Sequence, residues 1–275
     1  SKVIDSTSGI PIQTIHSFCQ SLLNRFPIES GIASSFQVAD KSKSMAMLND
    51  SLESILNFAY SGNAELEHAI SILSSRFTEL EFQKLISEIN DHRSHLKKIL
   101  LNGLTSAEYN FREALGLKVD DTEESISCAG CLNTAFNGSG LRESAEAMIN
   151  GSITDKKNGE IIIGWLDASE SDRKQNLWRY FSAFFTKKGS GETYKKLIYK
   201  NALELYPSAE LHLNNEASRL EVLRNNLLSI KTFNCSISLL VFTSYLLKEY
   251  ELMKKNNALL DYDDLILFAD SLLSQ

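Results

Sequence analysis

Hydrophobic side chains recur at three- and four-residue intervals along most of the chain, the spacing of one face of an α-helix. Near the N-terminus this apolar face consists of Ile15, Phe18, Cys19, Leu22, Leu23 and Phe26. Pro27 follows and ends the predicted helix. A second helix is predicted over Lys41–Tyr60, and a third helical pattern runs from residue 82 to 100. Ile10–Thr14 is instead short and compatible with a brief β-strand.

The C-terminal part of the chain predicts one very long helix or two nearly continuous ones. No proline or glycine follows Pro207, and apolar residues continue at helical spacing to Tyr250. A helix of that length suggests an element that joins subdomains. The most apolar stretch, Ser236–Leu247, is shorter than the roughly 20 residues of a membrane-spanning helix. It therefore predicts a buried helical segment and no membrane association.

Three regions between these helices have polar or glycine-rich patterns. The acidic residues after Lys118 predict a solvated helix start near Thr122. Asn137–Gly140 predicts a loop, and Asp155–Gly159 predicts a turn within a second weak region, Gly151–Gly159. With only three prolines and 13 glycines in 275 residues, the whole chain is expected to be mainly α.

Charge is distributed unevenly along the chain. The formal net charge of −7 argues against a protein that simply coats nucleic acid. Residues 171–200, however, carry eight bases and two acids, a net +6 that leaves −13 elsewhere. Aromatic residues at positions 178, 181, 184 and 185 lie within this basic segment at helical spacing, so we expect them in the core.

No motif for catalysis or metal binding is complete in this sequence. Cys128 and Cys131 form a CxxC without a second pair, and His92 and His95 fit ordinary helix positions better than metal ligands. The phosphate-binding pattern GxxxxGK[ST] is absent, and in Gly189–Thr193 a glutamate stands where a lysine is required. We therefore predict no catalytic residue, no metal site and no cofactor in this chain.

Two terminal segments carry a resemblance to a known family. The first reads TIHSFC from Thr14 and continues as LLNRFPIESG to Gly31; the second, LDYDDLI, spans Leu260–Ile266. Together they resemble superfamily 1 helicases of the UvrD/Rep/RecB type, and the first looks specifically like AddA, the helicase-nuclease subunit of bacterial double-strand-break repair. Weaker similarity covers the middle of the chain, including Gly164–Lys174 and Phe185–Ile198.

The resemblance implies an internal fragment of an ATP-driven DNA helicase. In that family the phosphate-binding loop precedes the TxHSF segment and the acidic Mg²⁺-binding motif follows LDYDDL, so ATP and Mg²⁺ are expected in the parent protein. Residues 1–40 would be a piece of the RecA-like α/β domain 1A, residues 41–250 a helical 1B-type insertion arm, and residues 251–275 the return into domain 1A. The fragment alone would be inactive, and the nuclease domain would lie elsewhere.

The resemblance also implies a path for single-stranded DNA. Thr14 and His16 would donate to phosphate oxygens, with Ser17 assisting as a helix cap, and the ring of Tyr262 would stack on a base. The alternative interpretations are that the first three residues only cap the helix, and that Tyr262 packs in the core while Asp261 caps the last helix. Asp263 and Asp264 are expected to hold neighbouring loops or basic side chains.

Four lysines in a glycine-containing loop, Lys187, Lys188, Lys195 and Lys196, are candidates for duplex phosphate contacts. A solvated face is the alternative interpretation. We expect duplex and single-stranded DNA and an AddB-type subunit as partners of a cytoplasmic parent protein. A helical module that docks a partner without DNA affinity remains the main alternative, and a degenerate stand-alone helical protein is a further one.

Overall fold

The computed structural model describes residues 13–274, which form a mainly α fold as the sequence predicts. The helices are α1 Ile15–Arg25, α2 Lys41–Tyr60, α3 Ala64–Ser74, α4 Glu79–Asp91, α5 Arg93–Leu101, α6 Leu104–Ala114, α7 Glu123–Cys131, α8 Gly138–Ile149, α9 Ile153–Asp167, α10 Glu170–Gln175, α11 Leu177–Phe181, α12 Lys200–Leu205, α13 Ala209–Asn256 and α14 Tyr262–Leu273. The strands are β1 Gln37–Val38 and β2 Leu259–Leu260, and the 3₁₀ turns are η1 Asn133–Ala135 and η2 Lys187–Gly189.

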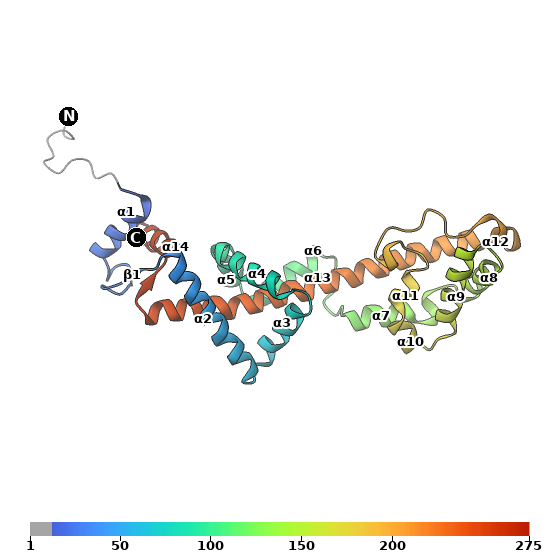
Figure 1. Cartoon of the computed structure of the whole chain (residues 1–275), viewed down its shortest axis with the longest axis horizontal. Helices are drawn as coiled ribbons and strands as arrows, with labels where there is room; N and C mark the ends of the chain where they lie inside the picture. Colours follow the sequence, from blue (N-terminus) through green and yellow to red (C-terminus); the bar gives the residue numbers. More distant parts are fainter. Residues whose placement is uncertain (1–12, 275) are drawn as a thin grey trace, which may run out of the picture. The chain divides into compact units, whose positions relative to one another are not determined.

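The chain divides into two compact units. One comprises the residues up to Leu104 together with those from Ile237 onward, and the other is Thr105–Ser236. The long helix predicted after Pro207 is the 48-residue α13, which contributes residues to both units (Figure 1).

In the first unit, a short parallel strand pair brings the two ends of the described chain together. Gln37 of β1 pairs with Leu259 of β2, and Val38 pairs with Leu260. As a result α14 packs beside α1, the red and blue helices near the C label in Figure 1. A buried apolar cluster fills the space between these elements: Cys19, Leu23, Phe36, Leu260, Leu265 and Ala269.

Helices α2 to α5 of the first unit pack along the C-terminal part of α13. The contacts include an edge-to-face pair between Phe82 and Phe242, with ring centroids 5.4 Å apart. They also include a hydrogen bond from Ser54 to Glu249 at 2.9 Å. Helix α2 has the predicted bounds: the Asp40 side chain accepts from the Lys43 N–H at its start, and Gly62, with φ +117°, follows its end.

The second unit has an aromatic core. Trp165 of α9 stacks on Tyr180 of α11, with ring centroids 3.9 Å apart. Phe181, Phe184 and Phe185 are fully buried, which confirms the predicted core positions of the basic segment. Trp178 is half-buried and meets Phe181 edge to face at 5.2 Å.

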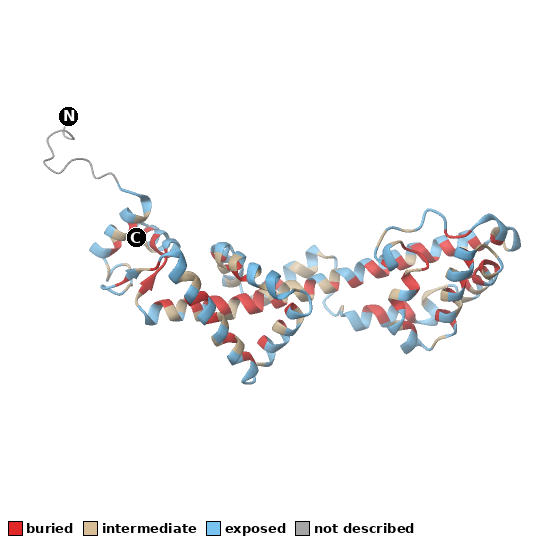
Figure 2. Ribbon diagram, viewed as in Figure 1, coloured by how far each residue is buried: buried red, intermediate tan, exposed pale blue. Residues whose placement is uncertain are grey.

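The length and composition of α13 would also suit a membrane span, and this is the candidate span among the described residues. Burial along the helix, seen as recurring red segments in Figure 2, includes Leu240, Val241, Phe242 and Leu246. The core helix of a globular protein has the same composition, and the buried side chains agree with the predicted buried segment.

Two predicted loops are helical. Asn137 caps α8, its side-chain oxygen accepting from the Gly140 N–H at 3.1 Å, so the Asn-Gly run opens a helix. The predicted turn over Asp155–Gly159 lies inside α9. Gly159 is needed there for close packing, because a Cβ at that position would lie 2.7 Å from the Ala145 carbonyl oxygen of α8.

Two further predictions from the sequence differ from the structure in detail. The helical pattern over residues 82–100 is interrupted at His92, which ends α4 and precedes α5. Arg93, the next residue, turns back to bind Asn90 at 2.9 Å, a contact that the apolar spacing does not encode. Of the predicted strand Ile10–Thr14, residues 10–12 lie outside the described part, and Gln13 and Thr14 are not in a strand.

Candidate nucleic-acid interface

The start of α1 is organised by Thr14. Its hydroxyl oxygen accepts from the Ser17 N–H at 3.2 Å and lies 3.0 Å from the Ser17 hydroxyl. Thr14 is therefore the N-cap, and Ser17 lies within the first turn rather than acting as a cap. Both side chains are exposed, so capping leaves them accessible from solvent.

His16 and Tyr262, from opposite ends of the chain, meet at the surface of the first unit. Their ring centroids are 4.9 Å apart with an interplanar angle of 62°, an edge-to-face arrangement. Tyr262 is 45% exposed, which excludes the alternative that it packs in the core. The structure thus brings His16 of the first segment into contact with the predicted aromatic residue of the second.

The backbone at Tyr262 is fixed by a capping box at the start of α14. Asp261 Oδ1 accepts from the N–H groups of Asp263 and Asp264, both at 3.1 Å. The Asp264 side chain in turn accepts from the Asp261 N–H at 3.0 Å. Asp261 is thus the predicted cap of the last helix, and Tyr262 is the first residue after it.

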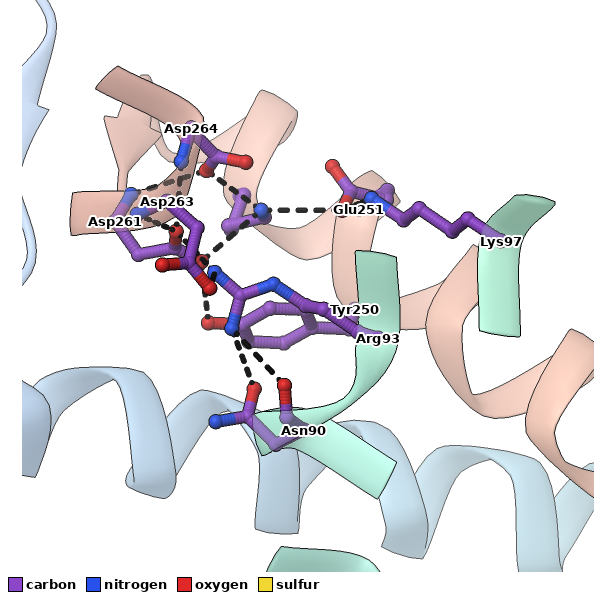
Figure 3. Close-up of polar contacts among 9 residues, drawn as sticks. Asn90, Arg93, Lys97, Tyr250, Glu251, Asp261, Asp263 and Asp264 are labelled. Atoms are coloured by element: carbon purple, nitrogen blue, oxygen red, sulfur yellow. Dashed lines mark hydrogen bonds and ion pairs between the residues drawn. The ribbon is translucent and has the colours of Figure 1, made fainter. Parts of the chain in front are cut away.

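Arg93 of α5 forms ion pairs with Asp261 and Asp263, the residues on both sides of Tyr262. Its Nη2 lies 2.5 Å from Asp261 Oδ1 and 2.8 Å from Asp263 Oδ2 (Figure 3). The arginine side chain is 7% exposed. Asp261 is equally buried, so the ion pair is shielded from water, whereas Asp263 is half-exposed.

Lys254 of α13 supplies a second buried cation to the same cluster. Its ammonium lies 2.6 Å from Asp264 and 3.2 Å from Asp261. It also lies 3.1 Å from Glu251, which binds Lys97 at 2.6 Å. The expectation that Asp263 and Asp264 hold basic side chains is met by Arg93 and Lys254.

The electrostatics of this cluster follow from burial and charge pairing. Burial favours the neutral acid at Asp261, but Lys254 and Arg93 outweigh it and hold the pKa of Asp261 below its ordinary value. Burial raises the pKa of Asp264, against the opposing effect of Lys254. Burial, reinforced by the Asp261 charge, raises the pKa of Tyr250 to about 12. The Tyr250 hydroxyl donates to Asp261 at 3.1 Å.

Sequence reasoning identified Asp261, Asp263 and Asp264 of this cluster but missed Glu251 and the cations. Arg93 is 168 positions from Asp261, and nothing in its neighbourhood marks it as different from other helix-surface arginines. The buried carboxylates of Asp261 and Asp264 do require positive partners. The sequence therefore indicated that these carboxylates need cationic partners, but it did not indicate which of the 28 basic residues supply them.

The four predicted lysines lie together in the second unit, on a hairpin-like segment after α11. All four side chains are exposed: Lys187, Lys188, Lys195 and Lys196. The Thr186 N–H donates to the Glu192 carbonyl at 2.9 Å, and the Tyr194 N–H donates to Phe184 at 2.9 Å. We call residues 186–196 the lysine loop.

Two other basic residues of segment 171–200, Arg173 and Lys174, interact with other parts of the chain. Arg173 is buried and donates to the carbonyls of Trp165 and Leu166 at 3.0 and 2.6 Å, ending α9. Lys174 pairs with Glu124 of α7. The +6 charge of the segment is therefore not all available to a ligand, and the lysine loop holds the largest exposed share.

Gly189–Thr193 does not have the geometry of a phosphate-binding loop. The segment begins in the 3₁₀ turn η2 and closes a hairpin, whereas a phosphate-binding loop leads into a helix whose N–H groups face the phosphates. Within residues 13–274, no three His, Cys, Asp or Glu side chains are placed to hold a metal ion. Cys128 and Cys131 are free thiols there.

The family model of the UvrD/REP helicase N-terminal domain matches residues 2–275 of the chain. No curated protein matches the chain.

Proposed function

The chain belongs to the UvrD/REP helicase family, and we propose that it supplies DNA-contacting surfaces to an ATP-driven helicase of recombinational double-strand-break repair. The observation that best supports this proposal is the 4.9 Å contact between His16 and Tyr262, which brings together the two motifs that resemble superfamily 1 helicases. ATP and Mg²⁺ would bind to other parts of the parent protein.

The first contact surface would follow single-stranded DNA. The exposed hydroxyls of Thr14 and Ser17 and the imidazole of His16 would donate to phosphate oxygens, which sets position without reading bases. The exposed ring of Tyr262 would stack on one base of any sequence. Arg93 and Asp261 support this role because they hold the backbone on either side of that ring.

The second contact surface would be the lysine loop. Four exposed ammonium groups on one loop can neutralise phosphates of a duplex without base contacts. In this proposal residues 41–250 form the 1B-type arm, and residues 1–40 and 251–275 belong to domain 1A. The parent protein would be cytoplasmic, would bind an AddB-type subunit and would carry a nuclease domain elsewhere.

A second candidate function is docking without DNA affinity. Exposed apolar side chains support it: Ile15 is 68% exposed, Phe18 47% and Leu267 49%. These residues of α1 and α14 would then pack against other helicase domains or a partner subunit. Removing the four lysines should weaken DNA binding if the lysine loop contacts DNA, whereas the docking function predicts no DNA binding to lose.

Fluorescence anisotropy of a labelled fork DNA, titrated at low and moderate salt, tests the proposal. The quadruple variant K187A/K188A/K195A/K196A should bind more weakly and with a shallower salt dependence, because fewer counterions are released. The control is K156A/K157A, which removes two exposed lysines of α9 outside the lysine loop. Absence of salt-sensitive binding by the native chain would overturn the proposal and favour the docking function.

A further inference from the structure

A buried arginine lies directly beneath the lysine loop. Arg224 of α13 donates through Nη1 to the carbonyl oxygens of Gly189 and Gly191, at 3.2 and 2.5 Å. Its guanidinium carbon lies 4.1 Å from the centroid of the Phe185 ring. Within the described residues Arg224 forms no ion pair: its Nη1 donates to the loop carbonyls and its guanidinium packs on the ring face, whereas its Nε is buried without a hydrogen-bond partner.

The backbone of the loop is held in a conformation that lysine rarely adopts. Lys187 and Lys188 have φ values of +50° and +57°, in the left-handed region, and Gly189 has φ +96°. Such residues cost on the order of 1 kcal/mol each and persist only where surrounding contacts hold them. The Thr186 carbonyl accepts from the N–H groups of Gly189 and Gly191, at 3.1 and 2.9 Å.

The other side of the loop is closed by α11. A Cβ at Gly189 would lie 2.9 Å from Phe181 Cβ and 3.1 Å from the Trp178 carbonyl oxygen. A side chain at this position would therefore push the turn away from its helix. Gly189 and Arg224 fix the loop from two directions, and neither needs to touch a ligand to do so.

We infer that Arg224 is a positioning residue for phosphate binding: it presents Lys187 and Lys188 in a fixed turn to the backbone of duplex DNA. This inference rests on the proposed DNA contact of the lysine loop. A pre-ordered turn avoids the conformational entropy that a flexible loop would lose on binding. The lysines supply the charge, and Arg224 supplies their geometry.

Two variants disturb the geometry without changing the charge. Arg224→Lys keeps the cation but cannot reproduce the planar guanidinium over Phe185 together with two hydrogen bonds. Gly189→Ala adds a methyl group against α11 and disfavours the positive φ. The matched control is Arg142→Lys, in an exposed ion pair with Asp167 of the same unit.

Limited trypsin digestion, followed by mass spectrometry, measures the order of the loop directly. Cleavage after Lys187 and Lys188 should be about tenfold faster in R224K and G189A, because proteolysis follows the population of the opened loop. Cleavage at lysines outside the loop should be unchanged in both variants, and R142K should match the native chain.

Fork-DNA anisotropy on the same samples measures the consequence for binding. Affinity should fall about three- to tenfold in R224K and G189A, while the salt dependence keeps the native slope because all four lysines remain. The quadruple lysine variant should lose slope as well as affinity. This difference separates a positioning residue from a phosphate ligand.

Native-like cleavage and affinity in R224K and G189A would overturn the inference while leaving the proposed function intact. Loss of the helical circular dichroism signal in both variants would also overturn it, because Arg224 would then maintain the fold of the whole unit. Failure of the native chain to bind DNA would refute both the proposed function and the inference.

Discussion

The guanidinium of Arg93 lies 2.5 Å from the carboxylate of Asp261, although 168 positions separate the two residues in the chain. The pair joins α5 to the start of α14, next to the exposed ring of Tyr262. Lys254 and Tyr250 complete the surroundings of the same carboxylate. This cluster explains why Asp261 and Asp264 can be buried as carboxylates and why Tyr262 between them has a defined position.

Replacing Arg93 by methionine should strongly destabilise the chain. The substitution leaves Asp261 buried with one cation fewer, and breaking a buried pair of this kind typically costs about 3–5 kcal/mol. Urea denaturation followed by circular dichroism measures the change. Lys97→Met removes a half-exposed ion pair with Glu251 and serves as the control, with an expected cost of about 0–1 kcal/mol. Equal midpoints for the two variants would contradict a dominant role for Arg93.

Acidic pH should lower the free energy of unfolding of the first unit, because Asp261 becomes protonated. Its pKa is lower in the folded chain than in the unfolded chain, so its contribution is fully present above the unfolded value, about 3.9. That contribution is lost as pH falls through the folded value. Glu251, whose pKa is also lowered despite burial because of Lys254 and Lys97, adds to the same loss. The raised pKa of Asp264 opposes it in part.

Urea midpoints of the native chain and Asp261→Asn, measured between neutral pH and about pH 3, test this expectation. The asparagine variant can still cap α14 but has no carboxylate to protonate. Its stability should therefore decline less steeply on the acid side. Parallel curves for the two proteins would show that Asp261 does not contribute to the acid sensitivity.

Two glycines of α9 should respond to alanine in opposite directions. Gly159→Ala places a methyl group 2.7 Å from the Ala145 carbonyl oxygen and should cost about 1–3 kcal/mol by forcing α8 and α9 apart. Gly164 has open space around the same position, so Gly164→Ala should stabilise the helix by about 0.5–1 kcal/mol. Thermal unfolding monitored by circular dichroism distinguishes them. A stabilising Gly159→Ala would refute the close helix packing.

Single-strand binding should depend on the ring of Tyr262 rather than on its hydroxyl. Tyr262→Ala should weaken binding of a labelled oligonucleotide by about 1–3 kcal/mol, the usual contribution of one stacked base, whereas Tyr262→Phe should bind like the native chain. Anisotropy titrations with oligonucleotides of two different sequences measure both effects. Equal losses in the two variants would argue for a hydrogen bond from the hydroxyl instead of stacking.

His16 gives a complementary test of the same surface. Its ring packs edge to face with that of Tyr262, with centroids 4.9 Å apart, so His16→Ala removes both the proposed phosphate donor and one side of the aromatic pair. His16→Phe retains the aromatic contact but cannot donate. Binding that is restored by phenylalanine would assign His16 to ring positioning, and binding that stays weak would assign it to phosphate contact.

The sequence by itself determined the helical character of this protein and the bounds of its clearest elements. Apolar spacing and end signals predict α1 and α2 because amphipathic periodicity, capping residues and Pro27 are local properties. The same signals failed at Asn137 and at Gly159. Asn137 instead begins α8, and Gly159 allows α9 to pack closely against α8, a contact that local turn signals do not record.

Only the tertiary structure decided which residues meet. The pairing of β1 with β2 brings the two motifs together, so the contact of His16 with Tyr262 depends on strands of two residues each. Arg93 and Arg224 have no local signature, because the sequence around a long side chain does not record what that side chain reaches. Local periodicity encodes elements, whereas the partners of buried charges are set by chain topology and by the need to satisfy each charge out of water.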